Sequence, residues 1–191
     1  MATVREGKSG VLVVVDVQVG VMRAAWDAAR VIGNIAQAVA RARDQRVPVI
    51  WVQHTNQELV QGSPQWQWVP ELVPALGEPL IHKRYNSAFE QTAFEDQLAR
   101  LGATHIVLAG AETNWCIRAT AYGALERGYD LTLLEDAHTA ITMDLGSGGQ
   151  VEAASVIRDL NMTMQWLEYP GRKSGIARAE QVQFAAPGGT A

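Results

Sequence analysis

Short runs of aliphatic residues recur along this chain, and they constrain its fold more than any other feature. The first run, at residues 11–15, contains only valine and leucine and ends at Asp16. Four later runs repeat the pattern, at residues 47–53, 79–82, 104–109 and 129–134. Strands that are apolar on both faces belong to parallel sheets that are covered on each side. The runs therefore predict a buried parallel sheet.

Two segments with helical periodicity separate the early runs. The first places four apolar residues on one helical face, namely Val31, Ile35, Val39 and Ala42. The second does the same with Phe94, Leu98 and Leu101. Thr92 and Glu95 have the spacing of a capping box at the start of this second helix, and Gly102 is expected to stop it.

Two further helices are expected in the second half of the chain. A third helix is predicted to begin near Cys116 and to end before Gly128. A fourth presents one apolar face, formed by Ala153, Val156, Ile157 and Leu160. A sixth strand is expected after it, at about residues 162–167.

The alternation of strands and helices predicts the fold class. With right-handed crossovers it gives a doubly wound α/β fold, a six-stranded and mainly parallel sheet with helices on both faces in a three-layer, Rossmann-like arrangement. The length of 191 residues fits one domain, 1–191, with a core at about residues 10–168 and a tail at about residues 169–191.

Composition excludes several classes of function. The formal net charge is −4 and the Lys and Arg residues are scattered, so the basic surface of a nucleic-acid-binding protein is missing. No apolar run reaches the roughly 18 to 20 residues of a membrane helix, and the first ten residues lack the apolar stretch of a secretory signal. We expect a cytoplasmic protein whose partners are small molecules or proteins, not nucleic acid or membrane.

Two segments interrupt the alternation of strands and helices. Residues 55–77 are too long for an ordinary connection and are rich in Trp, Pro and Gly, which predicts a functional loop or an oligomer contact. The tail from Pro170, with its Gly-rich end at residues 187–190, is expected to be mobile or wrapped on a neighbouring subunit.

Three residues with useful chemistry follow strands of the predicted sheet. Asp16 ends the first strand, Lys83 follows the third, and Cys116 lies just past the fourth. Ligands bind at the carboxyl ends of the strands in open α/β sheets, where these side chains are expected to meet. Taken singly, each has a structural explanation: a buried packing cysteine, a strand-end cap and a surface lysine.

Together the three residues suit nucleophilic catalysis. Cys116 is the only cysteine, so it forms no internal disulfide and no thiolate-rich metal site. At a helix start beside Lys83, its thiolate is expected to be favoured, and thiolates attack acyl carbons. Burial would raise the pKa of Asp16 and a nearby ammonium would lower it, which suits proton transfer.

The local strings around these residues resemble the isochorismatase-like cysteine hydrolases. The stretch 108–117, LAGAETNWCI, is similar to the nucleophile motif of that family. Residues 13–18, with their Asp-Val-Gln core, look like its first-strand motif, and residues 83–89, KRYNSAF, like its Lys motif. Further likeness at residues 62–72 and 128–139 extends the resemblance over nearly the whole of residues 11–167.

The resemblance implies specific roles for these residues. It makes Asp16, Lys83 and Cys116 a catalytic triad, and it implies a non-proline cis peptide between Ala111 and Glu112. The backbone N–H groups of Glu112 and Cys116 would form an oxyanion hole. It also implies a homo-oligomer, a dimer or a tetramer, and hydrolysis of a C–N bond in a small amide, ureide or lactam through a thioester on Cys116.

The sequence departs from the resembled family at two positions that bear on ligands. Glu112 stands where many relatives have a small or hydroxyl residue, and it is expected either to turn outward or to select a cationic group. The Asp-x-His pair of metal-dependent relatives is missing, since only His54 follows the second strand. We therefore expect no catalytic metal and no cofactor. The candidate pocket residues are Gln18, Trp26, His54, Trp66, Tyr85, Glu112 and Trp115.

Three alternative functions remain open at this point. A nucleotide- or flavin-binding module is disfavoured because no Gly-rich phosphate loop follows the first strand. A catalytically silent interaction protein is disfavoured by the complete set of three motif residues. Vinyl ether hydrolysis of the isochorismate type uses a different residue at the position of Cys116, so the cysteine favours amide chemistry.

Overall fold

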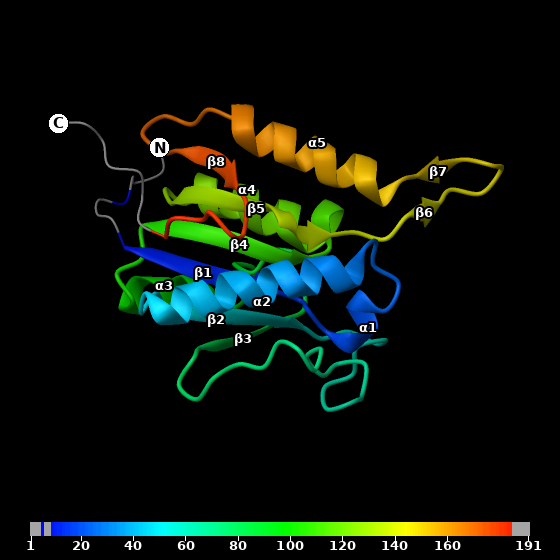
Figure 1. Cartoon of the computed structure of the whole chain (residues 1–191), viewed down its shortest axis with the longest axis horizontal. Coiled ribbons are helices and arrows are strands. Elements are labelled where there is room, and N and C mark those ends of the chain that lie inside the picture. Colours follow the sequence, from blue (N-terminus) through cyan, green and yellow to red (C-terminus); the bar gives the residue numbers. More distant parts are fainter. Residues whose placement is uncertain (1–4, 6–8, 185–191) are drawn as a thin grey trace.

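A six-stranded parallel sheet forms the centre of the molecule. The computed structural model of the chain describes residues 5 and 9–184. The strands of the sheet are β1 (Gly10–Val15), β2 (Val49–His54), β3 (Leu80–Lys83), β4 (His105–Ala111), β5 (Asp130–Thr139) and β8 (Ser174–Ala177). Their spatial order is β3-β2-β1-β4-β5-β8, and every neighbouring pair is parallel (Figure 1). The predicted doubly wound α/β fold is confirmed.

Helices cover both faces of this sheet, as the apolar runs require. Val11, Val13 and Val15 pack with the helices α3 (Phe94–Arg100), α4 (Arg118–Glu126) and α5 (Ala153–Trp166). Leu12 and Val14 face the other way, toward α2 (Ala28–Asp44). Successive side chains of a strand point to opposite faces, so a continuous apolar run is needed to fill both layers.

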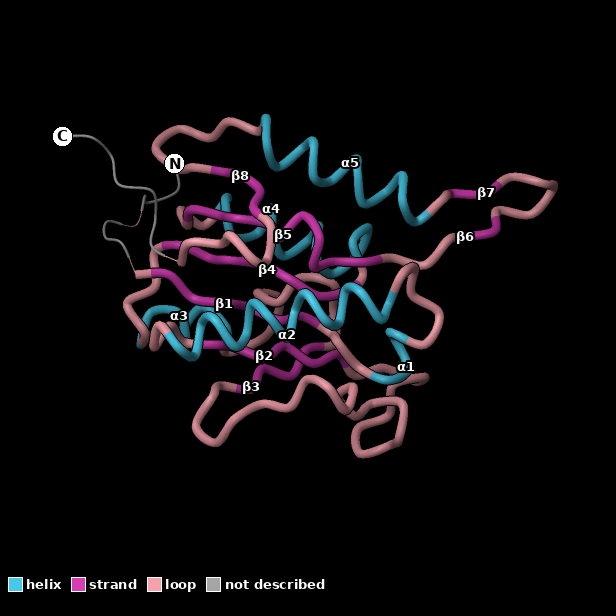
Figure 2. The backbone as a smooth tube through the Cα atoms, in the orientation of Figure 1, coloured by secondary structure: helices cyan, strands magenta, loops and turns pink. Residues whose placement is uncertain are grey.

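Short elements occur outside the central layers. Helix α1 (Val19–Met22) follows β1, and a π-helical turn, η1 (Thr113–Ile117), joins β4 to α4. A two-stranded hairpin, β6 (Met143–Asp144) with β7 (Gln150–Val151), extends away from the sheet at the start of α5 (Figure 2). Among the described residues, no helix combines the length and the apolar character that a bilayer crossing requires.

The position of the last strand was predicted wrongly. Residues 162–167 are not a strand, because α5 continues to Trp166. The alternation of Met162, Met164 and Trp166 resembles a strand, but Met164 is buried and extends the helical face of Ala153, Ile157 and Leu160. The helical period therefore prevails over the local alternation.

The sixth strand comes instead from the segment predicted to be a mobile or wrapped tail. Strand β8 pairs with β5 in the register Leu131 to Ser174 through Leu134 to Ala177. Its sequence, SGIA, is half-buried at every position and carries no strong apolar signal. An edge strand with one neighbour needs little apolar surface, which explains why the sequence pattern missed it. The Gly-rich end at residues 187–190 lies outside the described residues.

The expected capping box of the second predicted helix does not form. The Thr92 hydroxyl accepts a hydrogen bond from the N–H of Phe94 at 3.2 Å. Glu95, however, pairs with the Arg5 guanidinium at 2.6 Å and with Arg127 at 3.4 Å. A charged partner offers the carboxylate a stronger hydrogen bond than a backbone N–H, so Glu95 is drawn away from the helix start.

Gly110 allows β4 to approach β1 closely beside the carboxyl edge of the sheet. Its φ is +125°, and a Cβ built there would lie 2.0 Å from the carbonyl oxygen of Val15. A side chain at this position would push apart the two strands that lead to Asp16 and to η1. The close pairing of β4 with β1 beside Asp16 therefore depends on a missing Cβ.

We predict that Gly110→Ala lowers the free energy of unfolding by about 2–4 kcal/mol, because backbone atoms cannot yield to the new methyl group. Gly33→Ala is the matched control, since a Cβ at this position on α2 meets nothing within 4 Å. That change should raise the free energy of unfolding by up to about 1 kcal/mol through helix propensity. Urea titration of both variants checks the prediction, and equal effects would contradict it.

Candidate active site

Three strand ends bring the candidate catalytic residues to one edge of the sheet. Asp16 directly follows β1 with φ +53°, a left-handed conformation that aspartate tolerates better than most residues. Lys83 is the last residue of β3, and Cys116 lies within η1 after β4. The strand order reverses between β1 and β4, and this switch point leaves a crevice at the carboxyl edge.

The Lys83 ammonium is the centre of the site. Its Nζ lies 2.7 Å from Asp16 Oδ2 and 3.0 Å from Cys116 Sγ. His54 Nδ1 and the carbonyl oxygen of Tyr85 lie 3.1 and 3.2 Å from the same nitrogen. An ammonium has three protons to donate, so four acceptors surround three N–H bonds. The Lys83 side chain is 0% exposed, which makes these contacts its whole environment.

A second carboxylate oxygen of Asp16 remains free. Asp16 Oδ1 is buried and has no hydrogen-bond partner among the described residues. Ligand atoms of Asp16, His54 and Cys116 all lie within 4.8 Å of one another. The Asp16 carboxylate therefore lies near the thiol and has an oxygen free to accept, which suits removal of the thiol proton.

The same three side chains have the chemistry of a metal site, but Lys83 occupies it. The ammonium contacts Asp16, His54 and Cys116 at hydrogen-bond distance, so a positive charge of the protein already lies among the three groups. A divalent cation there would be repelled by the lysine. The expectation of a metal-free reaction stays a prediction.

The pKa of Cys116 shifts in the direction opposite to the one expected from the sequence. Burial is the largest cause and the charge of Asp16 adds to it, so that the pKa of the thiol is raised to about 12 although Lys83 opposes both. Burial alone would lower the pKa of Lys83, but Asp16 and Cys116 beside it produce a net rise. These shifts favour a thiol on Cys116 and an ammonium on Lys83, whereas the sequence led us to expect a thiolate.

His54 lines the cavity as a neutral ring. Burial lowers its pKa, and the nearby charge of Lys83 lowers it further. If Nδ1 accepts from the ammonium, the ring proton is assigned to Nε2. His54 then offers the cavity a hydrogen-bond donor, and its lowered pKa favours the neutral ring.

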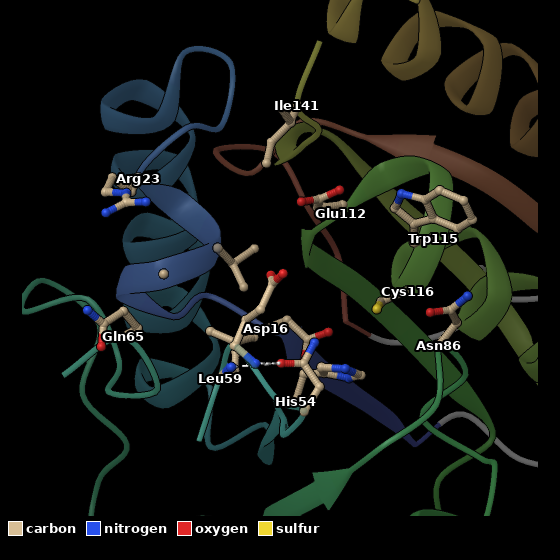
Figure 3. Close-up of a pocket in the computed structure, with 14 residues that line it drawn as sticks. Asp16, Arg23, His54, Leu59, Gln65, Asn86, Glu112, Trp115, Cys116 and Ile141 are labelled. Atoms are coloured by element: carbon tan, nitrogen blue, oxygen red, sulfur yellow. Dashed lines mark hydrogen bonds between the residues drawn. The ribbon is translucent and has the colours of Figure 1, made fainter. Parts of the chain in front are cut away.

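A cavity of about 590 Å³ opens above Cys116. Figure 3 shows Arg23 and Gln65 on one side of it, and Glu112 and Trp115 on the other. Of the seven predicted pocket residues, the lining includes His54, Glu112 and Trp115. Most of the remaining lining residues were not predicted from the sequence, namely Gly20, Val21, Arg23, Asn56, Glu58, Leu59, Gln65, Asn86 and Ile141.

The other four predicted pocket residues have structural roles or face elsewhere. Gln18 is fully buried, and its side-chain amide donates to the carbonyl oxygens of His54 and Trp66. The Trp66 indole N–H donates to Thr55, and its ring stacks on His82. The Trp26 ring carries the Arg30 guanidinium on its face, and Tyr85 is 49% exposed.

A cis peptide joins Ala111 to Glu112, as the resemblance implied. The carbonyl oxygen of Glu112 accepts hydrogen bonds from the N–H groups of Trp115 and Ile117, each at 3.1 Å. These bonds fix the backbone of Glu112 to the turn that carries Cys116. The oxyanion hole of Glu112 and Cys116 backbone N–H groups stays a prediction.

A series of hydrogen bonds with a fixed direction connects the turn η1 to β5 and α5. Asn161 donates its amide N–H to the carbonyl oxygen of Glu135, so its Oδ1 accepts from His138 Nε2 at 2.8 Å. His138 Nδ1 is then left to accept from the Thr113 hydroxyl, also at 2.8 Å. The chain links α5 and β5 to the first residue of η1. The sequence analysis gave no role to His138 or Asn161.

Comparison with known proteins identifies relatives of the whole core. The family model described as the isochorismatase domain matches residues 10–157. Maleamate amidohydrolase of Pseudomonas putida is 31% identical over 108 residues, which are 51% of this chain and 51% of that protein. A streptothricin hydrolase of Streptomyces noursei is 27% identical over 182 residues, 92% of this chain and 65% of the relative. The chain thus spans about half to two thirds of these relatives.

Solved structures show the same fold. A Pseudomonas putida KT2440 structure described as an isochorismatase superposes with a TM-score of 0.83 at 24% identity, covering 92% of this chain and 90% of that one. An N-carbamoylsarcosine amidase from Thermoplasma acidophilum superposes with a TM-score of 0.70 at 20% identity, covering 91% and 98%. Identity this low supports the arrangement of strands and helices alone.

We predict that Cys116 reacts with iodoacetamide with a pH midpoint well above the value of about 8.5 for a free thiol. Asp16→Asn should lower the midpoint because a negative charge beside the sulfur is removed, and Lys83→Met should raise it. Mass spectrometry reports the rate without ambiguity because the chain has one cysteine. Asp44→Asn, on the exposed end of α2, is the control, and a midpoint at or below 8.5 in the unchanged protein would refute the assignment.

We further predict that His138 makes stability dependent on pH. Burial lowers its pKa from 6.5 to about 4, so the unfolded chain binds a proton that the folded protein does not. Its contribution is complete above pH 6.5, is lost as the pH falls toward 4, and amounts to about 3 kcal/mol. The free energy of unfolding, measured by urea titration between pH 4 and 7, should depend less steeply on pH in His138→Gln than in the unchanged protein. The same pH dependence in His138→Gln as in the unchanged protein would contradict this prediction.

Proposed function

This chain belongs to the isochorismatase family, and on that basis we propose that it is a cysteine hydrolase of small amides, ureides or lactams. One observation carries the proposal: a single buried ammonium contacts both the sulfur of Cys116 and the carboxylate of Asp16 at the floor of an open cavity. A nucleophile, a base and a shared cation are the parts that acyl transfer through a thioester requires.

The reaction begins with transfer of the thiol proton to Asp16. The Cys116 sulfur then attacks the carbonyl carbon, and the oxygen takes up the negative charge in the backbone N–H groups of Glu112 and Cys116. Collapse of this intermediate breaks the C–N bond as Asp16 returns its proton to the departing nitrogen. The products of this half are an amine or ammonia and an acyl thioester on Cys116.

Water completes the cycle. Asp16 removes a proton from a water molecule as its oxygen attacks the thioester carbon. The C–S bond breaks, the carboxylic acid leaves, and the proton on Asp16 returns to the sulfur. Atoms and charges balance without an added metal or cofactor.

Lys83 makes the first proton transfer feasible. The transfer moves a negative charge from the Asp16 carboxylate to the Cys116 sulfur. Asp16 Oδ2 and Cys116 Sγ lie at hydrogen-bond distance from the Lys83 nitrogen, at 2.7 and 3.0 Å. The cation therefore stabilises the charge before and after the transfer, which lowers the cost of forming a thiolate in a buried site.

The names of relatives support amide chemistry over the alternatives. They include a maleamate amidohydrolase, ureidoacrylate amidohydrolases and streptothricin hydrolases. Ether hydrolysis of the isochorismate type is disfavoured because Cys116 occupies the nucleophile position, and a silent interaction protein is disfavoured because the three groups are in contact. We also propose that the protein is cytoplasmic and forms a homo-oligomer.

We predict that the three candidate catalytic residues fail in different ways on an amide identified from a panel of amides, ureides and lactams. Cys116→Ala should abolish turnover and leave binding largely intact, because the nucleophile is lost but the walls remain. Asp16→Asn should lower kcat by roughly 10² to 10⁴-fold, the range for general acid-base groups. Lys83→Met should also lower kcat.

The double variant Asp16→Asn with Cys116→Ala should be no slower than Cys116→Ala alone, because the residues act as one unit. Asp44→Asn should keep normal turnover. Release of ammonia or amine provides the measurement, and near-normal turnover by Cys116→Ala would refute the covalent mechanism.

A further inference from the structure

Glu112 presents an unpaired carboxylate to the cavity, next to the nucleophile turn. It directly follows β4, its side chain is half-buried, and it lines the cavity together with Cys116 (Figure 3). The carboxylate forms no hydrogen bond and no ion pair with any described residue. Two backbone hydrogen bonds to its carbonyl oxygen fix its position. The carboxylate is therefore held at the wall without a partner of its own.

The cations near the sulfur do not neutralise Glu112. Lys83 is already surrounded by four acceptors, including the carboxylate of Asp16. Arg23 also lines the cavity, but Figure 3 places it across from Glu112, and it is exposed to solvent. Charges in water are screened far more than charges in a partly buried site. The unbalanced charge closest to the nucleophile turn is therefore negative.

The environment of Glu112 makes a cation a favourable neighbour. Burial raises its pKa, and the negative charge of Asp16 raises it further. The first effect reflects lost water and the second reflects repulsion by a like charge, and neither is offset by a cationic partner among the described residues. An ammonium or guanidinium of a ligand would restore the missing partner.

We propose that Glu112 is a specificity-determining residue, and that the site selects amide substrates carrying a cationic group, an ammonium or a guanidinium, close to the scissile carbonyl. The proposal rests on the proposed function for its reference to a scissile carbonyl. It assigns to Glu112 the binding of the cationic group, while Cys116 attacks the adjacent carbon. Substrates that carry a carboxylate at the same place are disfavoured by repulsion from Glu112.

The test uses the single cysteine as a probe of charge and needs no substrate. Three methanethiosulfonates that modify thiols are compared: a cationic aminoethyl, a neutral methyl and an anionic sulfonatoethyl reagent. Each rate on Cys116 is divided by the rate of the same reagent with a free thiol. In the unchanged protein we expect a normalised cation-to-anion ratio of roughly ten. This is the size of effect expected between charges several ångströms apart in a partly solvated site.

Variants assign the preference to a residue. Glu112→Gln keeps the shape and should reduce the ratio toward one, while the rate of the neutral reagent reports any change in thiol reactivity. Glu58→Gln, a carboxylate on the exposed part of the lining, should change the ratio by less than about threefold. Arg23→Gln should raise the ratio, since it removes the opposing charge.

Two results would overturn the proposal. One is a normalised cation-to-anion ratio at or below one in the unchanged protein. This result depends on no variant, and it would mean that positive charge such as that of Arg23, and not Glu112, sets the charge preference at the thiol. The other is an unchanged ratio in Glu112→Gln, with Glu112→Ala as a second variant should the first not fold.

A substrate comparison distinguishes this proposal from the proposed function. On an amide and its amino-bearing counterpart, Glu112→Gln should lower the ratio of kcat/KM for the amino-bearing compound to kcat/KM for the neutral compound by roughly tenfold, since any effect on the backbone N–H of residue 112 is common to both reactions. Equal losses on both compounds would refute the role of Glu112 while the cysteine mechanism stands. Retained turnover by Cys116→Ala would refute the cysteine mechanism while the reagent ratio still reports on Glu112.

Discussion

The Lys83 ammonium is removed from water and is stabilised only by acceptors that separate segments bring to it. They come from the residue after β1, the end of β2, the residues after β3 and the turn η1. An unpaired buried ammonium would cost several kcal/mol, so the segments have to meet within hydrogen-bond distance. This requirement fixes the relative positions of three adjacent strands and one turn. The contacts that form the candidate catalytic site therefore also hold together the carboxyl edge of the sheet.

Local backbone features follow from the need to converge on this cation. Asp16 leaves β1 in a left-handed conformation, and Gly110 allows β4 to lie against β1 where any side chain would collide with the Val15 carbonyl. Below the turn, Thr113 is held by the chain through His138 and Asn161. The π-helical turn that carries Cys116 is thus anchored to β5 and α5.

The charges at the site are arranged so that a proton moves without a large change in electrostatic energy. Burial and the charge of Asp16 together outweigh Lys83, so the raised pKa of Cys116 favours the protonated sulfur. Transfer to Asp16 leaves the cation in contact with whichever group is negative. Glu112 then adds a carboxylate that pairs with no other described residue, and this asymmetry connects the catalytic chemistry to the choice of ligand.

The sequence by itself determined the layers and the identity of the three converging residues. Continuous apolar runs can be buried only in a sheet covered on both faces, and the local strings around Asp16, Lys83 and Cys116 identified them through the family they resemble. The sequence did not determine the sixth strand, since SGIA at residues 174–177 takes its strand conformation from pairing with β5. Nor did it determine the proton on Cys116 or the cavity wall, because burial and distances between segments far apart in the chain decide a pKa and a lining. Those quantities exist only once the tertiary structure has formed.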